Sequence, residues 1–229
     1  PLLVARVLLE HGELDRKRGD FDRSVQRLSD SAVQLGDLGD TEKQALALRL
    51  LGMSELGRGD ARLARSALEK SRSVAAKNED RRSEAWALQG LGLVAYRAGD
   101  LREAKLMVDA AVEIFEELGD SGGLAWANGI DAWVSFHTGD WDRTRELLET
   151  VGPEIRRRGD PWAESAMLNL AASVELWSGD LEAALASAQR SQVLAEKADD
   201  GSMMMQAQAL VGRSMVSLGQ IAPGVQVLE

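Results

Sequence analysis

Apolar residues recur at helical spacing along the chain, in segments that end at regular intervals. In the stretch 82–98 the apolar positions share one helical face, and they are Ala85, Leu88, Leu91, Val94 and Ala95. The stretch 101–118 repeats the pattern with Leu101, Ala104, Val108, Ala111, Val112 and Phe115. Each stretch therefore predicts one amphipathic helix.

A Gly-Asp dipeptide separates these two predicted helices. Glycine readily adopts the left-handed geometry that ends a helix, and aspartate accepts hydrogen bonds from the free amides that start the next one. The dipeptide recurs every forty residues at Gly19-Asp20, Gly59-Asp60, Gly99-Asp100, Gly139-Asp140 and Gly179-Asp180, with Gly219-Gln220 as a degraded copy. A second series alternates with it at Gly39-Asp40, Glu79-Asp80, Gly119-Asp120, Gly159-Asp160 and Asp199-Asp200. Such a fixed period is typical of a repeat array.

The two series predict an all-α solenoid of antiparallel helical hairpins, with five complete hairpins and the first half of a sixth. We expect a single array over residues 1–229, in which each hairpin packs on its neighbours. The predicted hairpins are approximately 1–39, 40–79, 80–119, 120–159, 160–199 and the truncated 200–229. The chain begins with Pro1 and stops in mid-repeat, so we expect it to be a fragment of a longer protein.

Two columns of small residues accompany the first dipeptide series. Eight residues before each Asp stand Gly12, Gly52, Gly92, Ala132, Ala172 and Gly212. Four residues after it stand Ser24, Ala64, Ala104, Thr144, Ala184 and Gly224. Small side chains at facing positions let two antiparallel helices approach closely, whereas larger ones would overpack the contact.

These columns, the Gly-Asp-apolar turn and the small residue eleven positions on (Ser31, Ser71, Ala111, Ser191) resemble the tetratricopeptide repeat family. Leu38-Gly39-Asp40 and Leu118-Gly119-Asp120 are similar to its extended variant. That variant is typical of sensor arrays in large bacterial transcription regulators and signalling ATPases, and of some eukaryotic scaffold proteins. The resemblance implies a right-handed superhelix. The family's aromatic residue five positions before the Asp is absent, and so is the proline after the second helix. HEAT-type repeats also have periods near forty, but the paired small columns fit them less well.

Composition narrows the function. The net charge is −10, which argues against nucleic-acid binding because that needs a basic surface. Cysteine is absent, so we expect a reducing, cytoplasmic compartment and no disulfide. No apolar run approaches the roughly 18 residues of a membrane span.

Recognisable catalytic chemistry is missing. The two histidines, His11 and His137, lie far apart in the array, and neither a His-Glu-x-x-His metal helix nor a Gly-Lys phosphate loop is present. We therefore expect no catalytic residues, no metal site, no cofactor and no enzyme activity in this segment.

The remaining candidate is a concave groove. The resemblance implies that first-helix side chains fourteen, eleven, seven, four and three residues before the Asp line it. The candidates are Arg49, Trp86, Gln89, Tyr96, Arg97, Trp126, Trp133, Phe136, His137, Asn169, Trp177 and Arg213. Six of the ten aromatic residues are among them. Exposed aromatic side chains suit recognition, but packing between helices is the alternative explanation.

Other residues carry structural predictions. Trp141 occupies the apolar turn column and is expected to pack in the structure. Trp162 could either pack in the structure or bind a ligand. Pro161 suits a first helical position. Pro153 predicts a kink or break near Val151, because an interior proline removes a helix hydrogen bond.

Three functional hypotheses follow. The first is a non-catalytic module of a bacterial signalling or transcription-regulatory protein, whose groove binds a protein, a peptide or a small effector. The second is a structural spacer or a self-association element that forms a homodimer through its terminal repeat. The third is a segment that regulates a neighbouring ATPase or cyclase domain.

Overall fold

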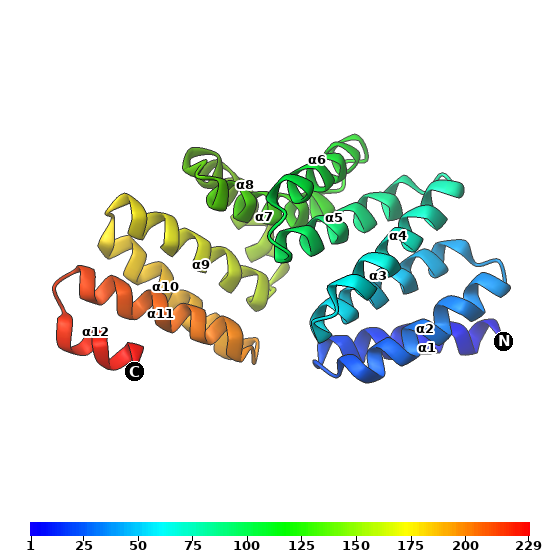
Figure 1. The fold of residues 1–229 in the computed structure, drawn as a ribbon, viewed down its shortest axis with the longest axis horizontal. Coiled ribbons are helices and arrows are strands. Elements are labelled where there is room, and N and C mark those ends of the chain that lie inside the picture. The colour runs from blue at the N-terminus through cyan, green and yellow to red at the C-terminus, as the bar shows by residue number, and fades with distance from the viewer. The chain divides into compact units, whose positions relative to one another are not determined.

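The computed structural model describes all 229 residues and consists of helices joined by short turns (Figure 1). This confirms the all-α class and the two helices per forty residues. The helices are α1 (Leu2–Lys17), α2 (Phe21–Asp37), α3 (Thr41–Arg58), α4 (Ala61–Lys77), α5 (Arg81–Arg97), α6 (Leu101–Glu117), α7 (Ser121–Thr138), α8 (Trp141–Arg158), α9 (Pro161–Ser178), α10 (Leu181–Lys197), α11 (Gly201–Ser217) and α12 (Ile221–Leu228).

Contacts divide the chain into two compact units, Pro1–Ile130 and Asp131–Glu229. In the first unit each helix packs on the next one from α1 to α6, and α3 also contacts α1 and α5. In the second unit successive helices pack from α8 to α12, and α9 also contacts α11 (Figure 1). We call the odd-numbered helices A helices and the even-numbered ones B helices.

The Gly-Asp joint works as predicted. Gly59 adopts a left-handed φ of 90°, which ends α3, and the Asp60 carboxylate accepts a 2.8 Å hydrogen bond from the Leu63 amide at the start of α4. Where the second series lacks glycine, Glu79 and Asp199 adopt φ values of 55° and 52°. The joint geometry is therefore retained at these two positions by residues that do not favour it.

The close approach of paired helices is also confirmed. A Cβ atom on Gly52 would lie 2.6 Å from Leu68 Cγ and 3.0 Å from the Ala64 carbonyl oxygen. Hydroxyl groups bridge the same interface, because Ser31 Oγ donates to the Ala5 carbonyl at 2.8 Å. Ser71 makes the matching bond in the second hairpin. The first two hairpins are therefore held by contacts to the backbone as well as by apolar packing.

Of the kink or break predicted near Val151, the break is wrong, and the kink stays a prediction. Helix α8 runs without interruption from Trp141 to Arg158, with Pro153 inside it. Both Pro153 and Glu149, whose carbonyl loses its hydrogen-bond donor, are exposed. Water can therefore satisfy that carbonyl, and the helix tolerates the proline.

Candidate functional site

The predicted groove positions differ in exposure according to their offset from the Asp. At the offset of three, Arg97, His137 and Trp177 are exposed. At the offsets of four, seven and fourteen the candidates are half-buried or, for Arg213, exposed. We use the term A-helix face for the nine candidates at these four offsets: Trp86, Tyr96, Arg97, Trp126, Trp133, Phe136, His137, Trp177 and Arg213.

The offset of eleven is mostly interior. Asn169 is 1% exposed, and its amide donates a 3.3 Å hydrogen bond to Met203 Sδ. Gln89 is buried as well, at 5% exposure. Neither side chain reaches the surface, whereas Arg49 at the same offset is only half-buried.

In the first unit, Arg49 on α3 and Trp86 on α5 form a pair. The Arg49 Cζ atom lies 5.2 Å from the centre of the Trp86 ring, a geometry that gives a cation–π attraction. Behind it, the rings of Trp86 and Phe115 meet edge to face at 5.1 Å. Burial lowers the pKa of Arg49 to about 10, and the nearby charge of Arg16 adds to that effect.

A hollow of about 550 Å³ opens beside this pair, and we call it the Arg49 hollow. Its walls come from α3, α4 and α5 and include Leu46, Ala45, Ser71 and Ser83. Polar and charged residues also line it, among them the carboxylates Glu42 and Asp80 and the arginines Arg49 and Arg82. Further along α5, burial raises the pKa of Tyr96.

In the second unit, three side chains of α7 form a ring cluster. His137 lies 6.1 Å from the Trp133 ring and 5.3 Å from the Phe136 ring. His137 Nδ1 is 2.9 Å from the Trp133 carbonyl oxygen, which fixes the imidazole on its own helix. Trp133 and Phe136 also pack against Leu147 and Leu170. Trp133 and Phe136 therefore pack against the core and are also partly exposed, whereas His137 is exposed.

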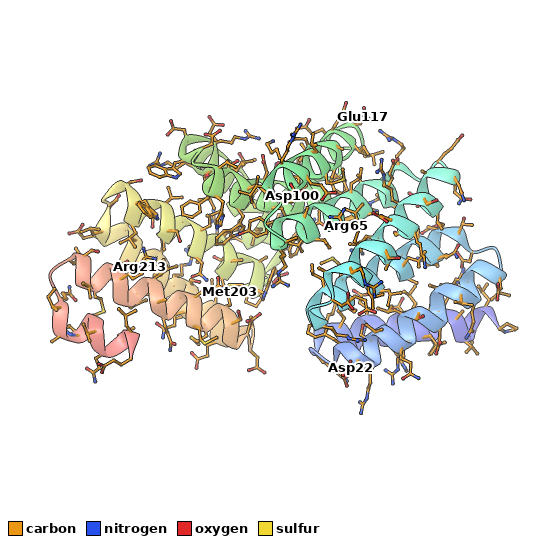
Figure 2. The ribbon with its side chains drawn as sticks, in the orientation of Figure 1. Asp22, Arg65, Asp100, Glu117, Met203 and Arg213 are labelled. Carbon is orange, nitrogen blue, oxygen red and sulfur yellow. The ribbon has the colours of Figure 1, made fainter.

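Trp177 at the end of α9 is the most open aromatic residue of the A-helix face, with 62% of its surface exposed. Its ring centre lies 6.2 Å from that of Trp141 at the start of α8. A hollow of about 300 Å³ beside Trp177 is also lined by Arg213 (labelled in Figure 2) and Leu228.

Sequence reasoning missed that Trp141 extends this surface. The turn column gave it a structural role, yet it is 39% exposed and stacks beside Trp177. The positions of the two residues along the chain could have predicted this contact. Trp141 lies at the start of one helix and Trp177 at the end of the next, and these two ends meet when the helices pack antiparallel.

No group of three or more His, Cys, Asp or Glu side chains is placed to hold a metal ion. No helix has the length and apolar character needed to cross a bilayer.

Comparison with known proteins places the fold. Residues 43–117, which span α3 to α6, match the model described as tetratricopeptide repeat. The same hairpin recurs through both units with the same joints and small columns. Residues 43–117 are tetratricopeptide repeats, and the other hairpins have the same two-helix form. A search of curated proteins found no match.

Solved structures with the same architecture cover nearly the whole repeat array. BtubC from P. vanneervenii is 16% identical with a TM-score of 0.69, over 94% of this chain and 88% of that one. The apo form of RapI is 9% identical with a TM-score of 0.77, over 100% and 81%. A Rap protein in complex with Competence and Sporulation Factor is 12% identical with a TM-score of 0.71, over 99% and 75%. At these identities the likeness establishes the fold of the repeat array.

Proposed function

We propose that the array is a non-catalytic interaction module that binds a peptide or an extended protein segment on its A-helix face. The observation that carries this proposal is the exposure of Trp177 together with His137 and Arg97 at the same offset in successive hairpins. Aromatic and arginine side chains supply large contact areas at low entropic cost, and they dominate protein recognition. Within each unit, stacked helical repeats present the A-helix positions next to one another.

Two further observations support the same function. The hollow beside Trp177 has apolar walls and one arginine, Arg213, which suits a peptide that carries apolar and acidic side chains. The Arg49 hollow has both arginines and carboxylates in its lining, which suits a polar segment of the same peptide. A protein of the same fold, the Rap protein, has been solved in complex with Competence and Sporulation Factor.

The biological setting is part of the proposal. The extended repeat resembles sensor arrays of bacterial transcription regulators and signalling ATPases, so we place this module in a cytoplasmic signalling or regulatory protein. Its ligand would then bias the activity of a neighbouring domain. A small effector in place of a peptide would need an enclosed pocket, and the open A-helix face favours the peptide.

The test is selection of peptides from a random display library on the full chain, followed by measurement of their dissociation constants by fluorescence anisotropy. We expect Arg97→Ala, His137→Ala or Trp177→Ala to weaken binding about tenfold or more, the loss of one interface hot spot. Val33→Ala, Leu106→Ala and Val193→Ala remove equally exposed side chains from B helices and are the matched controls. Peptides that bind all three A-helix variants normally but lose affinity for the controls would contradict the proposal.

Self-association is the second candidate, and a specific surface favours it. Helix α12 exposes Ile221 at 56%, with Val225, Val227 and Leu228 also exposed. Two copies that pair through α12 would remove these apolar side chains from water. Light scattering over a concentration series tests this, and we expect Ile221→Asp to abolish any dimer. A monomer at every concentration would exclude it.

A further inference from the structure

A third hollow, of about 430 Å³, is lined mainly by B helices of the first unit, and we call it the B-helix hollow. Helices α2 and α4 both pack on α3, and side chains of all three helices line the hollow (Figure 1). Its apolar lining includes Leu48 of α3, Val74 of α4 and Val33 of α2, which is 62% exposed. No residue of the A-helix face lines it, so it is separate from the surface of the proposed function.

The charged residues that line the B-helix hollow are two lysines of α4, Lys70 and Lys77, and no carboxylate lines it. Both lysines are exposed. The ion pairs of α4 are made by Arg65 and Arg72, whereas neither lysine forms one. In a chain with a net charge of −10, this hollow therefore combines an apolar lining with two unpaired cations.

The equivalent positions three repeats further on show why Lys70 has no acidic partner. Those positions hold Glu164 of α9 and Arg190 of α10, which form an ion pair. In the B-helix hollow the place of the glutamate is taken by Gln44. Its neutral amide offers no charge to the ammonium group of Lys70, so the pair that closes the later junction is missing here.

The junction one repeat further on is filled by larger side chains. Arg72 stands there at the position of Ala32 in the hollow, and its Nε lies 3.7 Å from Glu84 Oε1. Ile114 stands at the position of Val74 and is only 4% exposed. The first junction is therefore open because its own side chains are too small or too neutral to close it.

We propose that the B-helix hollow is a docking site for an acidic amphipathic helix of a partner protein. Lys70 and Lys77 lie two helical turns apart on α4, roughly 10 Å along its axis. A partner helix that lies along α4, with two acidic residues seven positions apart, pairs with both lysines. Apolar residues between those acids then cover Val74 and Val33.

A helix suits this hollow better than an extended segment does. The walls are helices whose backbone groups are already bonded within each helix, so they offer few partners to an incoming backbone. A helical ligand satisfies its own backbone and needs only side-chain contacts. This inference does not rest on the proposed function, because it concerns another surface and another kind of ligand.

The test uses the full chain and a labelled amphipathic helical peptide with two glutamates seven residues apart and two leucines between them. Fluorescence anisotropy measures its affinity beside that of a twin peptide with glutamine at both acidic positions. We expect saturable binding of the glutamate peptide, about fivefold tighter than that of its twin, as for two exposed ion pairs. The difference should shrink at high salt.

Variants of the exposed lysines locate the binding. The double variant Lys70→Gln with Lys77→Gln should bind the two peptides equally, and Lys70→Glu with Lys77→Glu should prefer a twin that carries lysines. Lys197→Gln is the matched control, because Lys197 is an exposed lysine at the position equivalent to Lys77 in the second unit.

Two further variants test the floor and the missing acid. Val33→Ala should weaken binding about fivefold through lost apolar contact, whereas Val193→Ala, at the equivalent position of α10, should not. Gln44→Glu restores the acid that the later junction has, so it should pair with Lys70 and weaken binding of the glutamate peptide.

Several results would overturn the docking site. They are the absence of saturable binding, equal affinity for the glutamate and glutamine peptides, and unchanged binding in the double lysine variant. Sedimentation with phosphatidylserine vesicles that requires both lysines, without peptide binding, would show that the occupant is a membrane surface.

The outcome is independent of the A-helix face. Trp177→Ala should leave binding of the helical peptide unchanged, and display-selected peptides that require Trp177 should bind the double lysine variant normally. Failure of the helical peptide therefore removes only the docking site, and failure of the A-helix variants removes only the proposed function.

Discussion

The indole Nε1 of Trp162 donates a 2.9 Å hydrogen bond to Oδ2 of Asp200, whose other carboxylate oxygen caps α11. One aspartate thus starts its own helix and also binds the preceding A helix. Asp120 is used in the same way, because it caps α7 and accepts a 2.8 Å bond from Arg82. The second Gly-Asp series therefore links successive hairpins as well as starting helices, and it gives Trp162 a structural role.

Loss of the indole donor should weaken the second unit. We expect Trp162→Phe to lower the free energy of unfolding by about 1 kcal/mol, the usual contribution of one hydrogen bond. Trp141→Phe is the matched control, since both tryptophans are 39% exposed and Trp141 keeps its ring contact with Trp177 as phenylalanine. Urea unfolding measures both variants, and equal effects would argue against the role of the Asp200 bond.

Acid should weaken the same joints. Hydrogen bonding from Arg6 holds the pKa of Asp40 below its usual value. For Asp120 burial raises the pKa, but bonds from the Gly123 amide and Arg82 outweigh it, so the net pKa is lowered. A carboxyl with a lower pKa in the folded state stabilises the fold above its unfolded pKa of 3.8, and this is lost as the pH falls through the folded pKa.

We therefore expect the free energy of unfolding to decline as the pH is lowered from about 5 to about 2. The decline should be shallower in the double variant Asp40→Asn with Asp120→Asn, measured by urea unfolding at a series of pH values. An unchanged slope would mean that these two carboxyl groups do not carry the acid sensitivity.

The left-handed residue Glu79 offers a way to stabilise the array. Its φ of 55° costs a residue with a Cβ about 1–2 kcal/mol relative to the favoured region. We expect Glu79→Gly to raise the free energy of unfolding by about 1 kcal/mol, despite the greater freedom of glycine in the unfolded chain. Asn78→Gly, one residue earlier with φ of −106°, is the control and should not stabilise. A destabilised Glu79→Gly would refute the strain at this joint.

The contact at Gly52 should reject any side chain. A Cβ atom there would lie 2.6 Å from Leu68 Cγ and 3.0 Å from a backbone oxygen. We expect Gly52→Val to destabilise the first unit by about 1–3 kcal/mol through overpacking. Gly201→Ala meets no atom within 4 Å and is the control. If both variants unfold at the same urea concentration as the parent, the close approach is not needed.

The helices and their ends could be predicted because they depend on local chemistry. Glycine geometry and aspartate capping act within a few residues, so the period alone located the joints. Pro153 shows the limit of a local rule, since the exposure of its helix face decided the outcome. The sequence shows that the proline removes a helix hydrogen bond. Only the fold shows whether water can bind the carbonyl that is left.

The candidate site was predictable in part. The offsets identified the A helices, but Asn169 is interior while Trp177, eight residues later on the same helix, is exposed. That difference depends on which neighbouring helices cover each position. The Arg49–Trp86 and Trp141–Trp177 pairs join residues from separate helices, and their geometry depends on packing that no local pattern records.

The most direct test of the central claim is amide hydrogen exchange of the full chain with and without a display-selected peptide. A ligand on the A-helix face should slow exchange in A helices such as α5 and α9. Exchange in the B helices α6 and α10 should stay unchanged. Protection confined to B helices or to α12 would contradict the account.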